Sequence, residues 1–186
     1  MSSGGSSDDP LLVVVDMQRV FAELDSPWYL GGFHGLVEPI ERLLLVFPER
    51  TVFSRFVVPE DPEGGWLDYY RQWSFVREPG ATSLLELAEP WNGRGFPVLD
   101  KPSFSAFGPA LQARAGNGTI VLCGVSTECC VLATAIQAAD AGISVRIVAD
   151  ACASLDQSTH DSALHVAVTG FSPLIAITTV AEELGG

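Results

Sequence analysis

The chain has 186 residues, of which 47% are hydrophobic and 18% charged, so it is long enough to bury a sizeable core and too apolar for a disordered protein. Its formal net charge of −13 disfavours nucleic acid and anionic membranes as partners, because both are bound through clustered Lys and Arg. No apolar run approaches the roughly 18 residues that a membrane-spanning helix needs.

The N-terminal stretch, MSSGGSSDDP, is small, polar and acidic, and it lacks the basic and apolar regions of a signal peptide. We expect residues 1–9 to form a disordered tail and residues 10–186 to form one domain. The 4 cysteines have no disulfide-scaffold spacing, which favours a cytoplasmic location. Zinc is disfavoured, because there is no paired CxxC motif and the 3 histidines are scattered.

Short apolar runs alternate with helical patterns along the chain. Near-continuous Val, Ile and Leu predict buried strands at residues 11–16, 50–56, 96–101, 119–125, 144–150 and 174–179. Helical patterns occupy residues 37–47, 83–89, 127–142 and 157–168, and a last helix follows the sixth strand. Gly142 can end the third of these helices at its C′ position. The alternation predicts an α/β fold, with a parallel sheet covered by helices on both faces.

Residues 57–80 interrupt this alternation and are rich in Pro, Gly and aromatic side chains. A segment of this length outside the regular elements is usually functional or disordered. Its aromatic residues argue against disorder.

Polar side chains stand where several predicted strands end. Asp16 ends the first strand, Lys101 the third and Asp150 the fifth, and the fourth leads to Cys129 and Cys130. Ligands of open α/β sheets bind outside the carboxyl ends of the strands, so a carboxylate, an ammonium and a thiol can meet there. Each residue taken alone also fits a structural role: a cap or turn, a solvated charge, or a small buried side chain.

Together these groups would make an activated nucleophile. Cys130 falls in the first turn of its predicted helix, where the helix dipole favours the thiolate, and Lys101 would favour it further. Asp16 could accept the thiol proton and return it to a leaving amine. Backbone N–H groups at the helix terminus could form an oxyanion hole.

Four stretches, VVVDMQRVF, KPSFSAF, GVSTECCVLATAIQAADAG and VADACAS, together resemble the isochorismatase-like cysteine hydrolases in order and spacing. That family includes nicotinamidases and N-carbamoylsarcosine amidases, and the resemblance runs from about residue 11 to residue 180. It implies a single-domain, Rossmann-like three-layer sandwich with a six-stranded parallel sheet of order 3-2-1-4-5-6. It also implies an Asp16–Lys101–Cys130 triad and assembly into a homodimer or homotetramer.

The resemblance distinguishes the adjacent cysteines. Cys130, directly before Val131, matches the nucleophile of the family's T-x-x-C-V motif. Successive helix positions are about 100° apart, so Cys129 should point elsewhere, and we expect it to be a small buried residue like Cys123 and Cys152. The family also places a cis peptide before this motif, here at Val125–Ser126, with the N–H groups of Ser126 and Cys130 as the oxyanion hole.

The chain departs from the nicotinamidases at their metal site. Those enzymes bind a metal through a D-x-H motif after the second strand, where this chain has Ser54 and Phe56. None of the three histidines falls there, so we expect no catalytic metal and no cofactor. His160 is expected only to cap or pack its helix.

Several residues are candidates for the substrate pocket. Phe21 follows the D-x-Q motif at the spacing with which the family lines its cavity, and Gln18 and Arg55 could supply polar groups. The aromatic segment offers three further candidates. These are Trp66, Tyr70 and Trp73. Ordinary packing or a subunit interface remains the alternative for each, and it is favoured for the last two.

The sequence therefore predicts a metal-independent cysteine hydrolase that cleaves a C–N bond of a small amide, carbamoyl or ureido substrate through a thioester. One alternative is isochorismatase-type vinyl-ether hydrolysis, which by resemblance works without a nucleophilic cysteine, so Cys130 argues against it. A catalytically silent, oligomeric interaction protein is the second alternative, and the intact triad argues against that. Dinucleotide binding lacks its motif, since no G-x-G-x-x-G follows the first strand.

Overall fold

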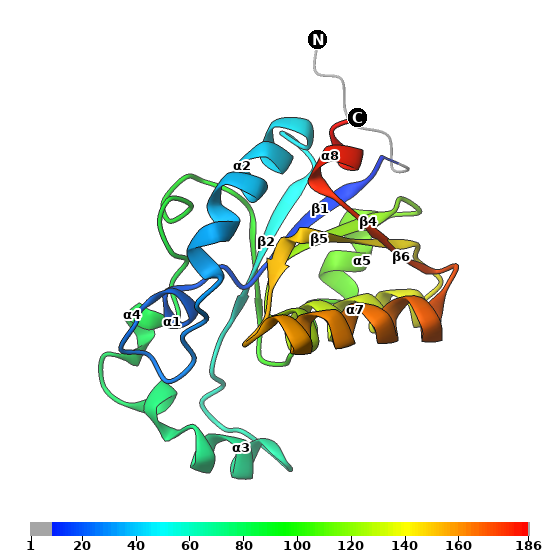
Figure 1. The fold of residues 1–186 in the computed structure, drawn as a ribbon. Helices are drawn as coiled ribbons and strands as arrows, with labels where there is room; N and C mark the ends of the chain where they lie inside the picture. Colours follow the sequence, from blue (N-terminus) through cyan, green and yellow to red (C-terminus); the bar gives the residue numbers. More distant parts are fainter. Residues whose placement is uncertain (1–8, 186) are drawn as a thin grey trace.

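A single parallel sheet of 6 strands, in the order β3-β2-β1-β4-β5-β6, forms the centre of the molecule and confirms the predicted topology (Figure 1). The computed structural model describes residues 9–185, so the predicted tail of residues 1–9 lies outside the described residues except for Asp9. The strands are β1 (Leu11–Val15), β2 (Thr51–Phe56), β3 (Val98–Lys101), β4 (Ile120–Val125), β5 (Val145–Ala153) and β6 (Ile175–Thr178).

Helices cover both faces of the sheet. The α-helices are α1 (Arg19–Ala22), α2 (Val37–Val46), α3 (Trp66–Gln72), α4 (Ala81–Leu84), α5 (Pro109–Ala115), α6 (Leu132–Asp140), α7 (Gln157–Phe171) and α8 (Val180–Glu183). Helices α2 and α8 pack together on one face, and α6 and α7 pack together on the other (Figure 1). No helix within residues 9–185 combines the length and the apolar composition that crossing a bilayer requires.

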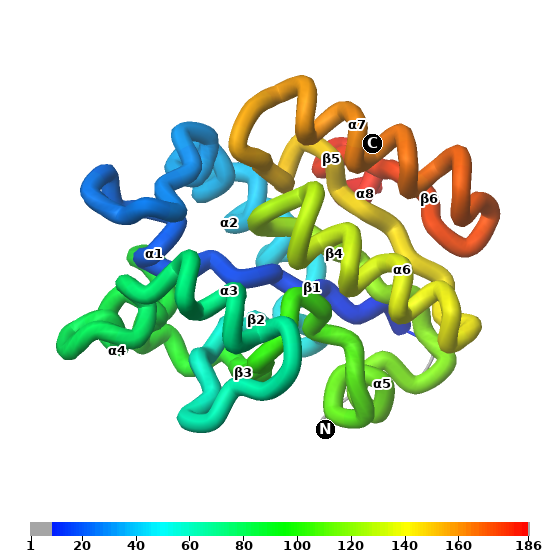
Figure 2. The backbone as a smooth tube through the Cα atoms, turned by 90° about the horizontal axis from the view of Figure 1, so that it is seen from below, coloured from blue at the N-terminus to red at the C-terminus, as the bar shows by residue number. Residues whose placement is uncertain are grey.

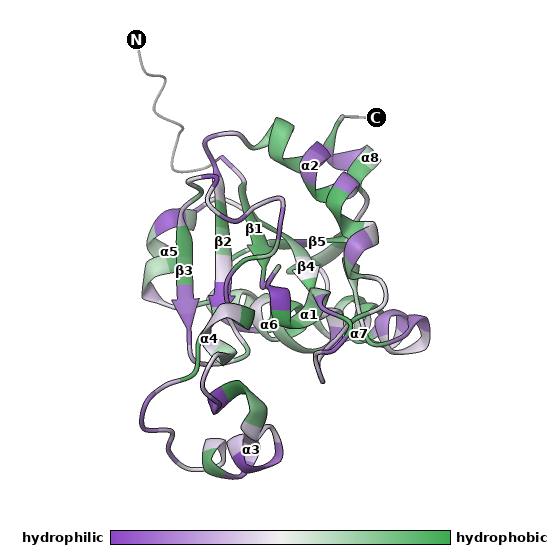
Figure 3. Ribbon diagram, turned by 90° about the vertical axis from the view of Figure 1, so that its left-hand side faces the viewer, coloured by the Kyte–Doolittle hydropathy of each residue, from purple (hydrophilic) through white to green (hydrophobic). Residues whose placement is uncertain are grey.

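The central strands are buried along their whole length. Every residue of β1 and β4 is buried, as expected for parallel strands with helices on both sides, and most of β1 is coloured hydrophobic in Figure 3. Helix α2 turns Ile40, Leu43 and Leu44 toward this core, which is the i, i+3, i+4 pattern of an amphipathic helix.

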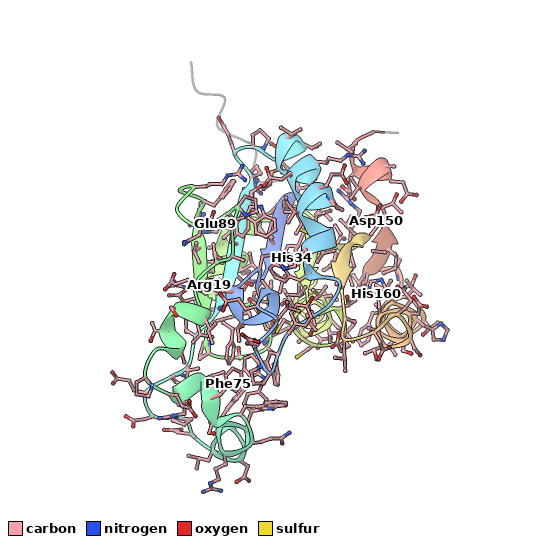
Figure 4. All side chains as sticks on the ribbon, turned by 60° about the vertical axis from the view of Figure 1, so that its left-hand side comes forward. Arg19, His34, Phe75, Glu89, Asp150 and His160 are labelled. Atoms are coloured by element: carbon pink, nitrogen blue, oxygen red, sulfur yellow. The ribbon has the colours of Figure 1, made fainter. Side chains whose placement is uncertain are left out.

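Several predicted elements differ from the observed ones. The helix expected over residues 83–89 is only the short α4, because the chain beyond it turns to pair Leu87 with Gln18. The fifth strand continues past Asp150 to Ala153, and the Asp150 carboxylate accepts a hydrogen bond from the N–H of Val180 at the start of α8 (2.8 Å; Figure 4).

Two more local features were not expected. Helix α5 was missed, because it is a short helix of 7 residues that begins at a proline. The helix expected over residues 127–142 begins with a π-helical turn, Thr127–Val131, before α6. Gly142 follows α6 with a φ of 83°, as predicted for its C′ position.

A glycine permits the close approach of β1 and β4 that shapes the carboxyl edge of the sheet. Gly124 pairs with Val15 and has a φ of 109°, and a Cβ at this position would lie 2.2 Å from the Val15 carbonyl oxygen. Only glycine fits such a site. The pairing brings Asp16, directly after β1, beside the Val125–Ser126 peptide bond that ends β4, and this bond is cis.

Candidate active site

Asp16 follows β1 in a backbone conformation that is uncommon for residues other than glycine, with a φ of 49°. Its side chain is fully buried. The backbone N–H donates to the Ser54 carbonyl oxygen (3.2 Å), and the Ser54 hydroxyl donates to Asp16 Oδ1 (2.6 Å). Strand β2 therefore fixes one carboxylate oxygen of Asp16 and leaves Oδ2 for other partners.

Lys101 ends β3 and is also buried. Its Nζ lies 2.7 Å from Asp16 Oδ2, and it donates to the carbonyl oxygens of Ser103 (2.9 Å) and Phe104 (2.8 Å). One carboxylate oxygen and two backbone carbonyl oxygens therefore surround the ammonium group. Burial opposes the charge of Lys101, but interaction with Asp16 and Cys130 raises its pKa above the ordinary value. The ammonium group therefore stays charged in this buried position.

Cys130 lies on the π-helical turn and interacts with both charged residues. Its hydrogen bond with Cys129, its burial and the negative charge of Asp16 raise its pKa well above the ordinary value, and Lys101 only partly offsets them. These three influences favour the neutral thiol of Cys130. Lys101 favours the thiolate, as expected from the sequence, and the other three influences outweigh it. A base is needed to activate the thiol, and Asp16 is the carboxylate beside it.

Cys129 is not the buried core residue that the helical spacing predicted. It is partly exposed and lines the same cavity as Cys130, because the turn that carries both is π-helical and lies in the cavity wall. The hydrogen bond with Cys130 is the main cause of a lowered pKa of the Cys129 thiol. Cys123 and Cys152 are buried, as predicted, and burial raises the pKa of Cys152 to about 12.

A cavity of about 290 Å³ opens in front of the two cysteines. Apolar and aromatic side chains form most of its wall, as is common for small-molecule sites. The lining residues are Phe21, Pro27, Trp28, Tyr29, Leu30, Phe56, Tyr69, Trp73, Phe104, Ser126, Glu128, Cys129, Cys130 and Leu155. Three of these residues are expected at the site from the sequence, namely Phe21, Ser126 and Cys130. For Trp73 the sequence favours packing or a subunit interface, and the structure places it in the cavity wall.

Gln18 does not line this cavity. It is fully buried, and its amide nitrogen donates to the carbonyl oxygens of Phe56 (2.9 Å) and Leu85 (2.5 Å). Its amide oxygen accepts from the Phe56 N–H (2.8 Å). The prediction of a substrate contact is wrong, because both amide hydrogens are used in joining β1 to β2 and to the segment after α4.

Arg55 also lies outside the cavity. Its guanidinium pairs with Asp100 (2.7 Å) and with Glu86 (2.7 Å), and it lines a separate cavity. Hydrogen bonding to Asp100 is the main cause of a raised pKa of Arg55. Its predicted role in the substrate pocket is wrong, because successive residues of a strand face opposite sides and Ser54 takes the inner one.

The aromatic residues of α3 divide by helical periodicity. Tyr69 in α3 and Trp73 directly after it, four positions apart, line the cavity, whereas Trp66 and Tyr70 stack on each other (5.9 Å, 27°). Neither Trp66 nor Tyr70 lines the cavity, so their predicted substrate contact is not observed. The α3 segment lies beyond the carboxyl ends of β2 and β3 in Figure 3, and Figure 2 looks onto the same edge of the sheet.

Three residues at the site are not identified as functional from the sequence. Trp28 lies at the centre of the aromatic wall, stacked on Phe21 (5.9 Å, 13°) and edge-on to Phe75 (5.2 Å, 84°), which Figure 4 labels in the lower part of the molecule. The sequence marks Ser54 only as a position where the nicotinamidases have a metal ligand, whereas in the structure its hydroxyl donates to Asp16. Glu128 lines the cavity together with the two cysteines, and the sequence gives no signal that singles it out.

His160 of α7 contacts the π-helical turn that carries Cys130. It is buried, and its Nδ1 lies 2.9 Å from the Thr127 hydroxyl. This contact joins α7 to the first residue of the turn, which is more than the capping or packing role expected for it.

The positions of the nicotinamidase D-x-H motif do not fit a metal ion. The Ser54 hydroxyl is used by Asp16, and Phe56 has no donor atom and packs edge-on to Trp28 (6.0 Å, 65°). Within residues 9–185, no three His, Cys, Asp or Glu side chains cluster in a way that could hold a metal ion.

Comparison with known proteins relates the chain to one family. The isochorismatase domain matches residues 10–179. The isochorismatase domain-containing protein 2 of Xenopus laevis is 43% identical over 61 residues, which are 31% of this chain and 30% of that protein. The matched segment therefore spans about a third of this curated relative.

Solved structures share the fold over nearly the whole chain. A cysteine hydrolase from Pseudomonas syringae pv. phaseolicola 1448A superposes with a TM-score of 0.82 and 23% identity, over 97% of this chain and 93% of that one. The nicotinamidase PncA from Bacillus subtilis gives 0.72 and 21%, over 90% and 99%. An N-carbamoylsarcosine amidase from Thermoplasma acidophilum gives 0.71 and 23%, over 92% and 96%.

Proposed function

Because the chain belongs to the isochorismatase-like hydrolase family, which includes cysteine hydrolases and amidases, we propose that it is a metal-independent cysteine amidohydrolase. Its substrate is a small amide, carbamoyl or ureido compound, and the bond that breaks is C–N. One observation carries the proposal: the buried Asp16–Lys101 ion pair (2.7 Å) lies against the Cys130 thiol in the wall of a cavity.

The first half of the reaction transfers one proton and forms one bond. Asp16 takes the proton of the Cys130 thiol on Oδ2, the carboxylate oxygen that Ser54 leaves free. The sulfur attacks the substrate carbonyl carbon, and the backbone N–H groups of Ser126 and Cys130 stabilise the oxyanion. Asp16 then returns the proton to the leaving nitrogen, the C–N bond breaks, and ammonia or an amine departs. The acyl group remains on Cys130 as a thioester.

The second half consumes one water molecule. Asp16 removes a proton from the water, and the resulting hydroxide attacks the thioester carbonyl. The C–S bond breaks, the proton returns to the sulfur of Cys130, and a carboxylic or carbamic acid leaves. Lys101 stays charged throughout and orients Asp16 in both halves, because its Nζ is fixed by hydrogen bonds to two backbone carbonyl oxygens and lies 2.7 Å from Asp16 Oδ2.

An ammonia-release screen tests the proposal. The purified chain is incubated with primary amides, ureas and carbamoyl compounds, and Cys130→Ala is run in parallel. Ammonia release by the wild-type chain that is absent in Cys130→Ala is expected for at least one class. Equal release by both proteins would show that the chemistry does not use this cysteine.

A further inference from the structure

The cavity in front of Cys130 combines aromatic rings with one negative charge. Glu128 is the acidic residue of its wall, and none of the lining residues is Lys, Arg or His. Two pairs of rings meet nearly at right angles and form corners: Trp28 with Trp73 (5.9 Å, 70°) and Tyr69 with Phe104 (5.6 Å, 79°). Such an arrangement of ring faces and one carboxylate matches the way proteins bind alkylated ammonium groups.

The Glu128 carboxylate has no positively charged partner among residues 9–185. Its Oε2 accepts a hydrogen bond from the Ser154 hydroxyl (2.5 Å), and the residue lines the cavity. Within the described part of the chain, no Lys, Arg or His forms an ion pair with it. Glu128 is partly buried, so its charge is only partly screened by water.

Lys101 and Arg55 are already engaged in ion pairs. Lys101 is 5% exposed, forms an ion pair with Asp16 and donates hydrogen bonds to two carbonyl oxygens. Arg55 is paired with Asp100 and Glu86 and lines a different cavity. A substrate carboxylate would therefore face Glu128 without any counter-charge, and an anionic substrate is disfavoured.

We infer that the substrate of this site is a cationic amide or ureide, whose reacting carbonyl meets Cys130 while an alkylated ammonium group lies among the aromatic rings near Glu128. This inference rests on the proposed function for the position of the carbonyl. Glu128 and Cys130 lie two residues apart on one turn, and the cavity is about 290 Å³, so a short spacer joins the two groups. The formal net charge of −13 also attracts cations toward the protein.

Three primary amides of matched shape test the inference. One ends in a trimethylammonium group, one in the isosteric tert-butyl group, and one in a carboxylate. The expected order of kcat/KM is cation, then neutral compound, then anion. Glu128→Gln keeps the oxygen that accepts from Ser154 and removes the charge, so it should lower the cation-to-neutral ratio roughly tenfold. Asp140→Asn removes an exposed charge on α6 and should leave this ratio within about twofold.

A binding measurement separates this inference from the proposed reaction. In Cys130→Ala, the dissociation constants of the same three compounds are obtained from the fluorescence of Trp28 and Trp73. Tighter binding of the trimethylammonium compound, weakened by Glu128→Gln, supports the inference even where no amide is hydrolysed, in which case only the proposed function fails. Equal or tighter binding of the neutral or anionic compound overturns the inference, and so does a ratio that Glu128→Gln leaves unchanged.

Discussion

Replacing Lys101 by Met should leave a buried carboxylate without its counter-charge. The side chains of Lys101 and Asp16 are 6% and 0% exposed, and Nζ and Oδ2 are 2.7 Å apart. At an effective dielectric constant of about 20, their attraction is on the order of 6 kcal/mol before desolvation is subtracted. Breaking such a pair from one side costs about 3–5 kcal/mol, so Lys101→Met should lower the free energy of unfolding by that amount.

The double variant Asp16→Asn/Lys101→Met is the matched control. It removes both charges, so it should be at least about 1.5 kcal/mol more stable than Lys101→Met alone. Urea unfolding followed by the fluorescence of the 4 tryptophans measures both values. A double variant that is no more stable than Lys101→Met would refute the reasoning, because the carboxylate would then not be a buried, uncompensated charge.

The pH dependence of the same difference follows from the raised pKa of Lys101. A group whose folded pKa lies above its unfolded value of about 10.5 contributes fully below the unfolded value, and loses this contribution as the pH rises through the folded pKa. The cost of Lys101→Met should therefore be constant between pH 7 and pH 9. A cost that falls steadily over that range would indicate that Lys101 loses its charge there.

Three further predictions concern the backbone, the metal and the second thiol. Gly124→Ala should destabilise the fold by more than about 3 kcal/mol in thermal unfolding, because its Cβ would meet the Val15 carbonyl oxygen at 2.2 Å. Gly170→Ala in α7 should stabilise the fold by about 0.5–1 kcal/mol. Similar values for the two variants would contradict this reasoning. Activity should survive EDTA, and loss in EDTA with recovery on adding zinc or manganese would contradict metal independence. Iodoacetamide at pH 7.5 without substrate should label Cys129 before Cys130 in peptide mapping, because Cys129 is partly exposed and Cys130 is buried. The reverse order would show that Cys130 is the more reactive thiol at rest.

The residues at strand ends were predictable because parallel strands expose their carboxyl ends at one edge. Asp16 and Lys101 were placed there from the apolar runs before them, and the strand order followed from the family resemblance. The position of Cys130 followed from the fourth predicted strand, which leads to it, and from its match to the family's T-x-x-C-V motif. What brings the two charges together is the pairing of β1, β2 and β3, which depends on contacts between residues far apart in the sequence.

The cavity wall was much less predictable. Whether Tyr69 or Tyr70 faces the substrate depends on the angle at which α3 docks, and the sequence of an isolated helix does not contain that angle. Gln18 was predicted to contact the substrate, but its side-chain amide forms hydrogen bonds with the backbone of Phe56 and Leu85 instead. Cys129 was misplaced because the 100° spacing of an α-helix does not apply to a π-helical turn.

Identifying the acylated sulfur tests the central claim most directly. A reaction with an amide from the ammonia-release screen is stopped with acid during turnover, and the peptide that carries both cysteines is mapped by mass spectrometry. The acyl mass is expected on Cys130, with a rate loss on the order of 10⁴–10⁶ in Cys130→Ala and activity within about tenfold in Cys129→Ala. An acyl group on Cys129, together with an inactive Cys129→Ala and an active Cys130→Ala, would contradict the account.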